Sequence, residues 1–140
     1  MSKDRDALVS LAREISRQAH APYSGVHVGA ALRSVSGQVY RGTNVENAAY
    51  PLGNCAESGA IAVGVAAEGA QFRIAEIAVW ATGRDGNARA ASPCGGCRQR
   101  IHELAADENV RVHFPWHDGA MRMATVGELL PFAFSLPRDG

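Results

Sequence analysis

Gly53-Asn54-Cys55-Ala56-Glu57 is the stretch around which this chain is organised, together with Ser92-Pro93-Cys94-Gly95-Gly96-Cys97 further along. The chain has three cysteines, and all of them fall in these two stretches. Cys94 and Cys97 form a Cys-x-x-Cys motif at the start of an expected helix, so both thiolates can point at one metal ion. Cys55 can bring a third sulfur to the same ion. Three protein ligands leave one position of a tetrahedral zinc ion open, which is typical of catalytic zinc sites.

Glu57 follows Cys55 by two residues, so its carboxylate can lie beside the open position without being a ligand. A bound metal ion lowers the pKa of its water, and a neighbouring carboxylate can accept and pass on the released proton. Thiolates also form readily at helix N-termini, where the partial positive charge of the backbone lowers their pKa. The pattern therefore predicts a catalytic zinc site in which Glu57 moves protons.

Four motifs, in their order and spacing, resemble the small homotetrameric cytidine deaminases. They are Asn44-Val45-Glu46-Asn47-Ala48-Ala49-Tyr50, Cys55-Ala56-Glu57, Pro93-Cys94-Gly95-Gly96-Cys97-Arg98-Gln99 and Leu129-Leu130-Pro131. Zinc with a cysteine-rich ligand set and a nearby glutamate is the known signature of zinc nucleobase deaminases. The resemblance runs from about Ala21 to Phe134. It implies hydrolysis of cytidine or 2'-deoxycytidine to uridine or 2'-deoxyuridine with release of ammonia, a reaction of pyrimidine salvage.

The same resemblance implies a role for each matching residue. The implied ligands of the Zn²⁺ cofactor are Cys55, Cys94 and Cys97, and the implied catalytic proton carrier is Glu57. The implied contacts to the reacting edge of the base are the N–H of Ala56 and the carbonyl of Ser92. Asn44 and Glu46 match the positions that hold the sugar hydroxyls, which a carboxylate and an amide can bind. Without the cysteine motif, this polar pair reads as a solvated strand end.

The resemblance also implies a homotetramer with shared active sites, because Tyr50 and Phe134 match positions that reach a neighbouring subunit's pocket. Gly59 and Gly64 lie in the Ala-rich helix expected from Cys55. A glycine inside a helix costs about 1 kcal/mol relative to alanine, so something is expected to approach closely. That partner is the sheet below the helix, a helix at the centre of the tetramer as the resemblance implies, or both.

Two positions depart from the family pattern. Ser58 stands directly after Cys-Ala-Glu, where the family usually places an arginine whose charge offsets three thiolates. A serine cannot supply that charge, so we expect a weaker Lewis acid. Val26 stands where the family commonly has a phenylalanine against the pyrimidine, which predicts a wider substrate-binding pocket. A modified cytosine nucleoside, such as blasticidin S or an N4-substituted cytidine, therefore stays open as an alternative substrate.

Three other interpretations of the cysteines compete with the catalytic site. A Cys-x-x-Cys motif near α/β patterning can be a redox pair, but Cys55 and Glu57 argue against it. A structural zinc site needs a fourth ligand, and none of the five histidines has a suitable spacing. The nearest, His102, lies five residues after Cys97 and points away from it on a helix. A binding module that had lost catalysis need not keep Glu57.

Composition favours one soluble cytoplasmic domain spanning residues 1–140. Fourteen basic residues balance fourteen acidic ones, so no electrostatic footprint for nucleic acid exists and a small nucleoside is the expected partner. The longest apolar run, Gly59 to Ala67, is too short to cross a bilayer, so no membrane partner is expected. No secretion signal opens the chain, and three cysteines do not suit a disulfide framework.

Periodicity predicts strands interleaved with helices, hence an α/β fold. The expected strands are Val26–Val35, Gln38–Val45, Ile74–Ala81, Val110–Phe114 and Met121–Met123. Helices are expected from Asp4 to Ala19 with Pro22 as its end, from Cys55 with Asn54 as N-cap, after Pro93, and from Thr125 with a capping box to Glu128. Tight turns are expected at Ser36-Gly37 and Asp118-Gly119. The resemblance implies a three-layer sandwich with a mixed five-strand sheet flanked by helices.

Overall fold

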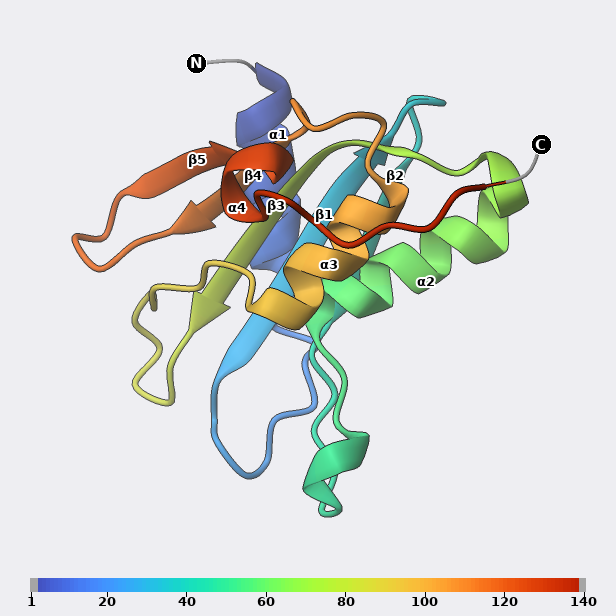
Figure 1. Cartoon of the computed structure of the whole chain (residues 1–140). Helices are drawn as coiled ribbons and strands as arrows, with labels where there is room; N and C mark the ends of the chain where they lie inside the picture. The colour runs from blue at the N-terminus through green and yellow to red at the C-terminus, as the bar shows by residue number, and fades with distance from the viewer. Residues whose placement is uncertain (1–2, 139–140) are drawn as a thin grey trace.

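The computed structural model describes residues 3–138 and shows a sheet covered by helices on both faces (Figure 1). The strands are β1 (His27–Ser34), β2 (Val39–Thr43), β3 (Ile74–Thr82), β4 (Arg111–Pro115) and β5 (Met121–Thr125). The helices are α1 (Lys3–Ser16), α2 (Ala56–Glu68), α3 (Gly95–Leu104) and α4 (Val126–Leu129), with short 3₁₀ turns η1 (Tyr50–Leu52) and η2 (Gly69–Gln71). The predicted single domain includes residues 1–2 and 139–140, which lie outside the described range.

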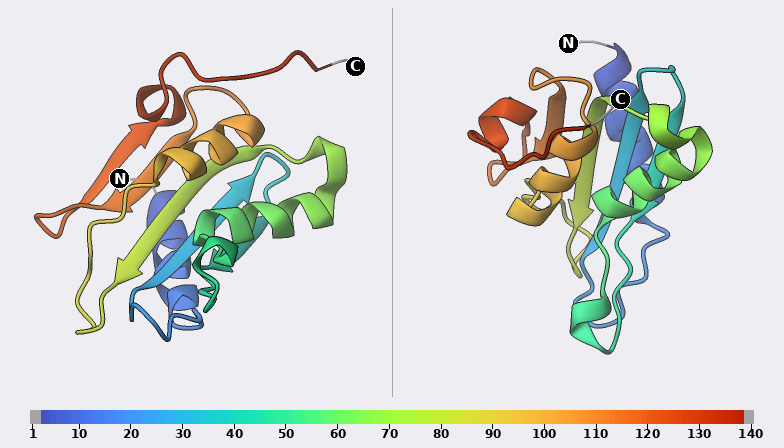
Figure 2. Two further views of the ribbon diagram at one scale, coloured as in Figure 1. Left: turned by 60° about the horizontal axis from the view of Figure 1, so that its bottom comes forward. Right: turned by 45° about the vertical axis from the view of Figure 1, so that its right-hand side comes forward.

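The five strands lie in the order β2-β1-β3-β4-β5. Only the β3–β4 pair is parallel among the strand pairs of residues 3–138, so the sheet is mixed. Helix α1 packs on β1 and β3 from one side, and α2 and α3 lie together on the other side (Figure 2). The predicted three-layer α/β sandwich with a mixed five-strand sheet is confirmed.

The side chains of β1 point alternately to the two faces of the sheet and so contribute to two layers of the hydrophobic core. Ala30 and Leu32 belong to the cluster under α2 and α3, whereas Ala31 packs against Leu8 and Ala12 of α1. Successive side chains of a strand point to opposite faces, so a strand covered on both sides is apolar throughout. Full burial of a leucine or isoleucine side chain contributes about 1.5–3 kcal/mol, and most of the core lies on the α2/α3 side.

Close packing seats α2 on the sheet. A Cβ added at Gly42 of β2 would lie 2.3 Å from the backbone nitrogen of Ala60, so the helix backbone touches the strand backbone. Gly59 of α2 faces the backbone of Thr43 at ordinary contact distance, and a Cβ at Gly64 would lie 2.3 Å from the Phe72 ring. Packing within one chain therefore accounts for Gly64, whereas Gly59 has room for a Cβ, and the contact at Gly42 seats the first turns of α2 on β2.

Two turns and one helix cap follow the sequence prediction. Gly37 and Gly119 have φ of +91° and +81°, which glycine adopts without strain in tight turns. Helix α4 carries the capping box: Thr125 N donates to Glu128 Oε1 at 2.8 Å, and Glu128 N donates to Thr125 Oγ1 at 3.2 Å. In residues 3–138, no helix combines the length and the apolar character that crossing a bilayer requires.

The predicted end of the first helix is wrong. Helix α1 ends at Ser16, six residues before Pro22. The chain then pairs with a distant segment, because His20 N donates to Asn44 O at 3.3 Å and Glu46 N donates to His20 O at 2.8 Å. A backbone recruited into this long-range ladder cannot stay helical.

Two further predictions are wrong because of the same long-range backbone pairing. Strand β2 ends at Thr43, so the polar pair Asn44 and Glu46 follows the strand and does not lie on it. Asn54 is not the N-cap of α2, because both its backbone groups pair with Val45 at 2.9 and 3.0 Å. Cys55 takes the N-cap position instead.

Candidate active site

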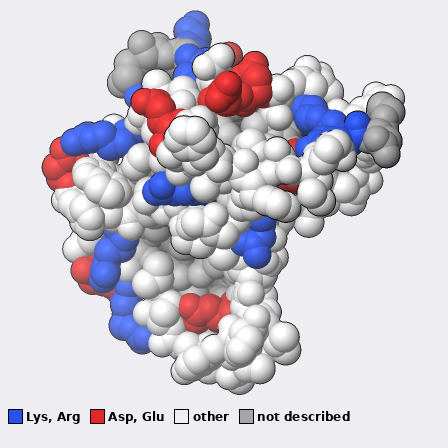
Figure 3. Space-filling model, in the orientation of Figure 1, with Lys and Arg blue, Asp and Glu red and all other residues white. Residues whose placement is uncertain are grey.

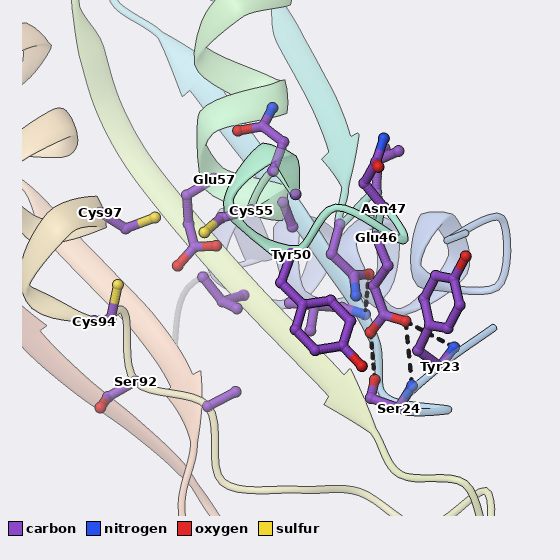
Figure 4. A pocket seen from close by; sticks show the side chains of 18 residues that line it. Tyr23, Ser24, Glu46, Asn47, Tyr50, Cys55, Glu57, Ser92, Cys94 and Cys97 are labelled. Atoms are coloured by element: carbon purple, nitrogen blue, oxygen red, sulfur yellow. Dashed lines mark hydrogen bonds between the residues drawn. The ribbon is translucent and has the colours of Figure 1, made fainter. Parts of the chain in front are cut away.

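The N-terminal ends of α2 and α3 open into a cavity of about 600 Å³. Val28 of β1 and Val79 of β3 line it from the sheet. The predicted site residues that line the cavity are Asn44, Glu46, Tyr50, Cys55, Ala56, Glu57, Ser92, Cys94 and Cys97. They come from the stretches 44–57 and 92–97, and Figure 4 shows Cys55 and Glu57 of the first stretch near Cys94 and Cys97 of the second.

The three cysteines lie at the N-terminal ends of two helices. Cys55 is the N-cap of α2, Cys94 is the N-cap of α3, and Cys97 lies in the first turn of α3. Neither N-cap cysteine makes a side-chain cap hydrogen bond within its helix. Backbone N–H groups of Cys97 and Gly96 lower the pKa of the Cys94 thiol. The N-terminus of α3 therefore favours the thiolate form of Cys94, as metal ligation requires.

Cys97 is buried, and its thiol pKa is raised by burial first and then by the nearby Glu57, Cys55 and Cys94 groups. These groups repel one another when ionised, and a divalent cation among them would offset that repulsion. Among residues 3–138, no three His, Cys, Asp or Glu side chains form a ready-made metal-binding group. The donor chemistry nevertheless fits zinc, because three sulfur atoms enter one cavity and zinc prefers thiolate ligands.

Glu57 lies in the first turn of α2 with only 6% of its surface exposed. Burial raises the pKa of its carboxyl group, and contacts with Cys97 and Arg100 oppose that shift less strongly. A carboxyl group whose pKa is moved toward neutrality can accept a proton and release it again in one reaction cycle. The geometry thus suits Glu57 for proton transfer.

Arg100 is a residue that the sequence prediction missed. Its Nη1 lies 3.7 Å from Cys97 Sγ, so α3 brings a guanidinium to the sulfur. Gly96 leaves room for this group, since an added Cβ would lie 3.2 Å from Arg100 Nη1. The sulfurs thus have a cation beside them although position 58 supplies none, and the weaker Lewis acidity expected from Ser58 stays a prediction. Residues three apart on a helix share a face, and this spacing from Cys97 was the available signal.

Glu46 and Asn44 lie together at one end of the cavity but use their side chains differently. Glu46 accepts from Tyr23 N at 3.0 Å, from Ser24 N at 3.2 Å and from the Ser24 hydroxyl (Figure 4). The Ser24 hydroxyl is the main cause of the lowered pKa of Glu46. The side-chain amide of Asn44 instead hydrogen-bonds to the backbone: Nδ2 donates to Val26 O and Oδ1 accepts from Val28 N, both at 2.9 Å.

Two predicted substrate contacts do not line this cavity. Val26 contributes its carbonyl to Asn44, and Val28, two residues on, lines the wall in its place. Val26 therefore gives no support for a widened pocket. Phe134 is 68% exposed and lies outside the cavity of its own chain. Tyr50, at 78% exposure, stands at the rim, with its ring edge-on to Tyr23 at a centroid distance of 6.3 Å.

Arg98 and Gln99 join the cysteine loop to the C-terminal segment. Arg98 Nε donates to Pro93 O at 2.7 Å, and its Nη1 donates to Leu129 O at 3.0 Å. Gln99 Nε2 donates to Phe134 O at 2.9 Å. The last two motifs of the resemblance are thus linked through backbone carbonyls, which fixes the loop that carries Cys94.

Comparison with known proteins agrees with this geometry. The family model described as "Cytidine and deoxycytidylate deaminase zinc-binding region" matches residues 2–113. A cytidine deaminase from Halalkalibacterium halodurans is 41% identical over 132 residues, 94% of this chain and 95% of its own length. One from Mycobacterium tuberculosis is 35% identical over 139 residues, covering 97% and 96%.

Solved structures give the same result. The crystal structure of cytidine deaminase from Burkholderia pseudomallei superposes with a TM-score of 0.79 at 38% identity, over 96% of this chain and 100% of that one. The Mycobacterium tuberculosis enzyme superposes with a TM-score of 0.77 at 31% identity, with coverages of 96% and 100%. Fold, cysteine-lined cavity and sequence agree, and this chain belongs to the zinc-dependent cytidine and deoxycytidylate deaminase family.

Proposed function

We propose that this chain hydrolyses the C4 amino group of cytidine and 2'-deoxycytidine, giving uridine or 2'-deoxyuridine and ammonia. The observation that carries the proposal is the meeting of Cys55, Cys94, Cys97 and Glu57 in one cavity. Membership of the family and the names of its relatives support the same reaction. Substrate and water enter, and the nucleoside product and ammonia leave, so no redox partner is needed.

Cys55, Cys94 and Cys97 would hold the zinc ion. Zinc, when bound, lowers the pKa of a water molecule and so supplies hydroxide at neutral pH. Glu57 takes the released proton and delivers it to N3 of the pyrimidine, where it stays in the product. Glu57 then takes the proton of the new C4 hydroxyl and delivers it to the amino group, so that the C4–N bond breaks, ammonia leaves and C4 keeps a carbonyl. Burial raises the pKa of Glu57 and so favours its protonated form during each transfer. The N–H of Ala56 and the carbonyl of Ser92 hold the reacting edge of the base.

The charges around the cavity favour a nucleoside over a nucleotide. Among the described residues that line it, none is lysine or arginine, whereas Glu46 and Glu57 bring two carboxylates. A phosphate group would find no cationic partner there and would be repelled by Glu46. Charges of both signs are interspersed over the face shown in Figure 3, without a broad basic patch. Together with the balance of fourteen basic and fourteen acidic residues, this disfavours a nucleic-acid substrate.

Exchange of Glu57 for glutamine tests the proposed chemistry. Glu57→Gln keeps the size of the side chain and removes the carrier of the proton. We expect zinc content to stay the same and turnover of cytidine to fall by at least roughly 10²–10⁴-fold, as is typical of general acid–base catalysis. Glu103 is exposed and forms an ion pair with Arg138. Glu103→Gln is therefore the matched control and should keep full turnover. Unchanged turnover in Glu57→Gln would exclude this role.

An ammonia-release assay across substrates tests specificity. Cytidine and 2'-deoxycytidine should be deaminated with the highest kcat/KM, deoxycytidylate much more slowly because of its phosphate, and cytosine more slowly because it lacks the sugar. N4-alkylcytidine is the probe for a modified cytosine substrate. A higher kcat/KM for N4-alkylcytidine than for cytidine would overturn the proposed preference.

We further propose that the chain assembles as a homotetramer with shared active sites. Helix η1 stands on an excursion that projects beyond the sheet (Figures 1 and 2), and its Tyr50 and Leu52 are 78% and 71% exposed. The C-terminal segment adds Phe132, Phe134 and Leu136 at 107%, 68% and 69%. Apolar side chains exposed on each of these two segments are typical of protein interfaces. Tyr50 at the cavity rim is then placed to meet a neighbouring subunit's pocket.

A further inference from the structure

The loop that begins at Tyr23 encloses the carboxylate of Glu46. Tyr23 N and Ser24 N donate to Oε1 at 3.0 and 3.2 Å, and the Ser24 hydroxyl donates to Oε2. The same hydroxyl accepts from Val26 N at 3.0 Å, so its own hydrogen is directed toward Glu46. Both carboxylate oxygens are therefore held by groups of one short loop, which Figure 4 shows beside the cavity.

Arg84 fixes this loop from its other side. Its Nη2 donates to Tyr23 O at 2.8 Å, and its side chain packs on Gly25, where an added Cβ would lie 3.0 Å from Arg84 Cβ. Gly25 has a φ of +72°, and its N–H donates to Ala21 O at 3.0 Å. The loop is thus tied down at three points, and the donors that meet Glu46 are in place before a substrate arrives.

We propose that Ser24 is a positioning residue for the nucleoside sugar, acting through Glu46. The inference rests on the proposed function, in which Glu46 accepts from a sugar hydroxyl. A carboxylate has about four acceptor sites, and the loop occupies three of them. The remaining acceptor capacity of this fixed carboxylate can face the cavity. Asn44 is less available to bind a sugar hydroxyl, because its side-chain amide already hydrogen-bonds to the backbone of Val26 and Val28.

Preorganisation gives this arrangement a measurable consequence. A hydroxyl that binds a fixed carboxylate avoids the cost of ordering that side chain on binding. Hydrogen bonds to an ionised acceptor are also stronger than neutral ones, and the three donors favour the ionised form of Glu46. Loss of the Ser24 hydroxyl should therefore weaken the binding of substrates that carry 2'- or 3'-hydroxyls and leave the binding of substrates without these two groups unchanged.

The test compares cytidine with 2',3'-dideoxycytidine in wild type, Ser24→Ala and Ser24→Thr. In Ser24→Ala, kcat/KM for cytidine should fall about tenfold, mainly through KM, as expected for one bond to a charged group. For dideoxycytidine, kcat/KM should stay within about twofold of wild type, because that substrate has no hydroxyl for Glu46. Ser24→Thr keeps the hydroxyl donor and should retain the wild-type ratio of kcat/KM between cytidine and dideoxycytidine. In a Glu46→Gln background, Ser24→Ala should have almost no further effect.

Ser36 supplies a matched control. Its hydroxyl also donates to a carboxylate, Glu68 Oε2 at 2.7 Å, and accepts the backbone N–H of the residue two positions on, at 3.3 Å. It lies away from the cavity, so Ser36→Ala should leave both substrates unaffected. If Ser24→Ala lowers kcat/KM equally for both substrates, Ser24 has only a structural role and the inference is overturned. If the wild-type enzyme deaminates neither, the proposed function itself fails, which is a separate outcome.

Discussion

Arg100 Nη1 lies 3.7 Å from Cys97 Sγ and so places a positive charge beside the sulfur atoms of the cavity. Three thiolates on a divalent zinc ion leave a net charge near −1, which a guanidinium can offset. Position 58, next to the first cysteine motif, holds a serine without charge. In this chain, the cation at the sulfurs comes from α3 and not from α2.

Removal of this charge should weaken zinc binding. In Arg100→Gln, we expect zinc affinity to fall about tenfold, the lower end of the range for groups that support metal ligands, because Arg100 is exposed. Competition with a chelator measures this directly. Ser58→Arg in the Arg100→Gln background should restore part of the affinity. Arg89→Gln, which loses only an exposed contact to Asp85, should bind zinc like wild type.

Each cysteine should be required for stoichiometric zinc. Metal analysis of the purified wild-type protein should give about one zinc per chain, and Cys94→Ala should lose it, since two remaining thiolates leave too few protein ligands. Cys55→Ala and Cys97→Ala should behave alike. Full zinc content in all three single variants would show that the ion lies elsewhere.

The mass of the protein in solution tests assembly. Light scattering should give about four times the chain mass of 14.8 kDa. Tyr50→Ala should lower activity more than zinc content if its ring completes a neighbouring subunit's pocket. The matched control is Tyr40→Phe, a tyrosine inside the chain that donates to Glu68 at 2.7 Å. A monomer that remains fully active at assay concentration would contradict shared active sites.

His113 should make stability fall in acid. It lies on strand β4 with its Nε2 2.6 Å from Glu76 Oε2, and burial lowers its pKa although Glu76 opposes the shift. A lowered pKa in the folded state means that the neutral ring is favoured. The stabilisation is therefore complete above the unfolded value near 6.5 and is lost as pH falls below it.

Urea unfolding at about pH 7.5 and pH 5.5 measures this effect. The free energy of unfolding of the wild type should drop between the two values, and His113→Gln should lose part of that drop. His117→Gln, at an exposed turn, should retain the wild-type dependence. Equal pH dependence in wild type and His113→Gln would rule out His113 as the source.

Much of the fold and of the cysteine-lined cavity was predictable because the signals are local. Continuous apolar runs mark the strands that are covered on both faces, as in β1 and β3. Thr125 and Glu128 form the cap that their spacing predicts. Three cysteines and Glu57 needed no long-range information to be recognised as one chemical set. Their convergence in one cavity followed from the helix ends on which they stand.

Other features depended on contacts between distant segments. The pairing of His20, Val45 and Asn54 ends α1 early, releases Asn44 from β2 and moves the α2 N-cap to Cys55. No local pattern encodes this pairing, because the segment at His20 is more than twenty residues away in sequence from Val45. The tertiary structure alone also decided that Val28 and not Val26 lines the cavity, and that the sulfurs receive their cation from Arg100.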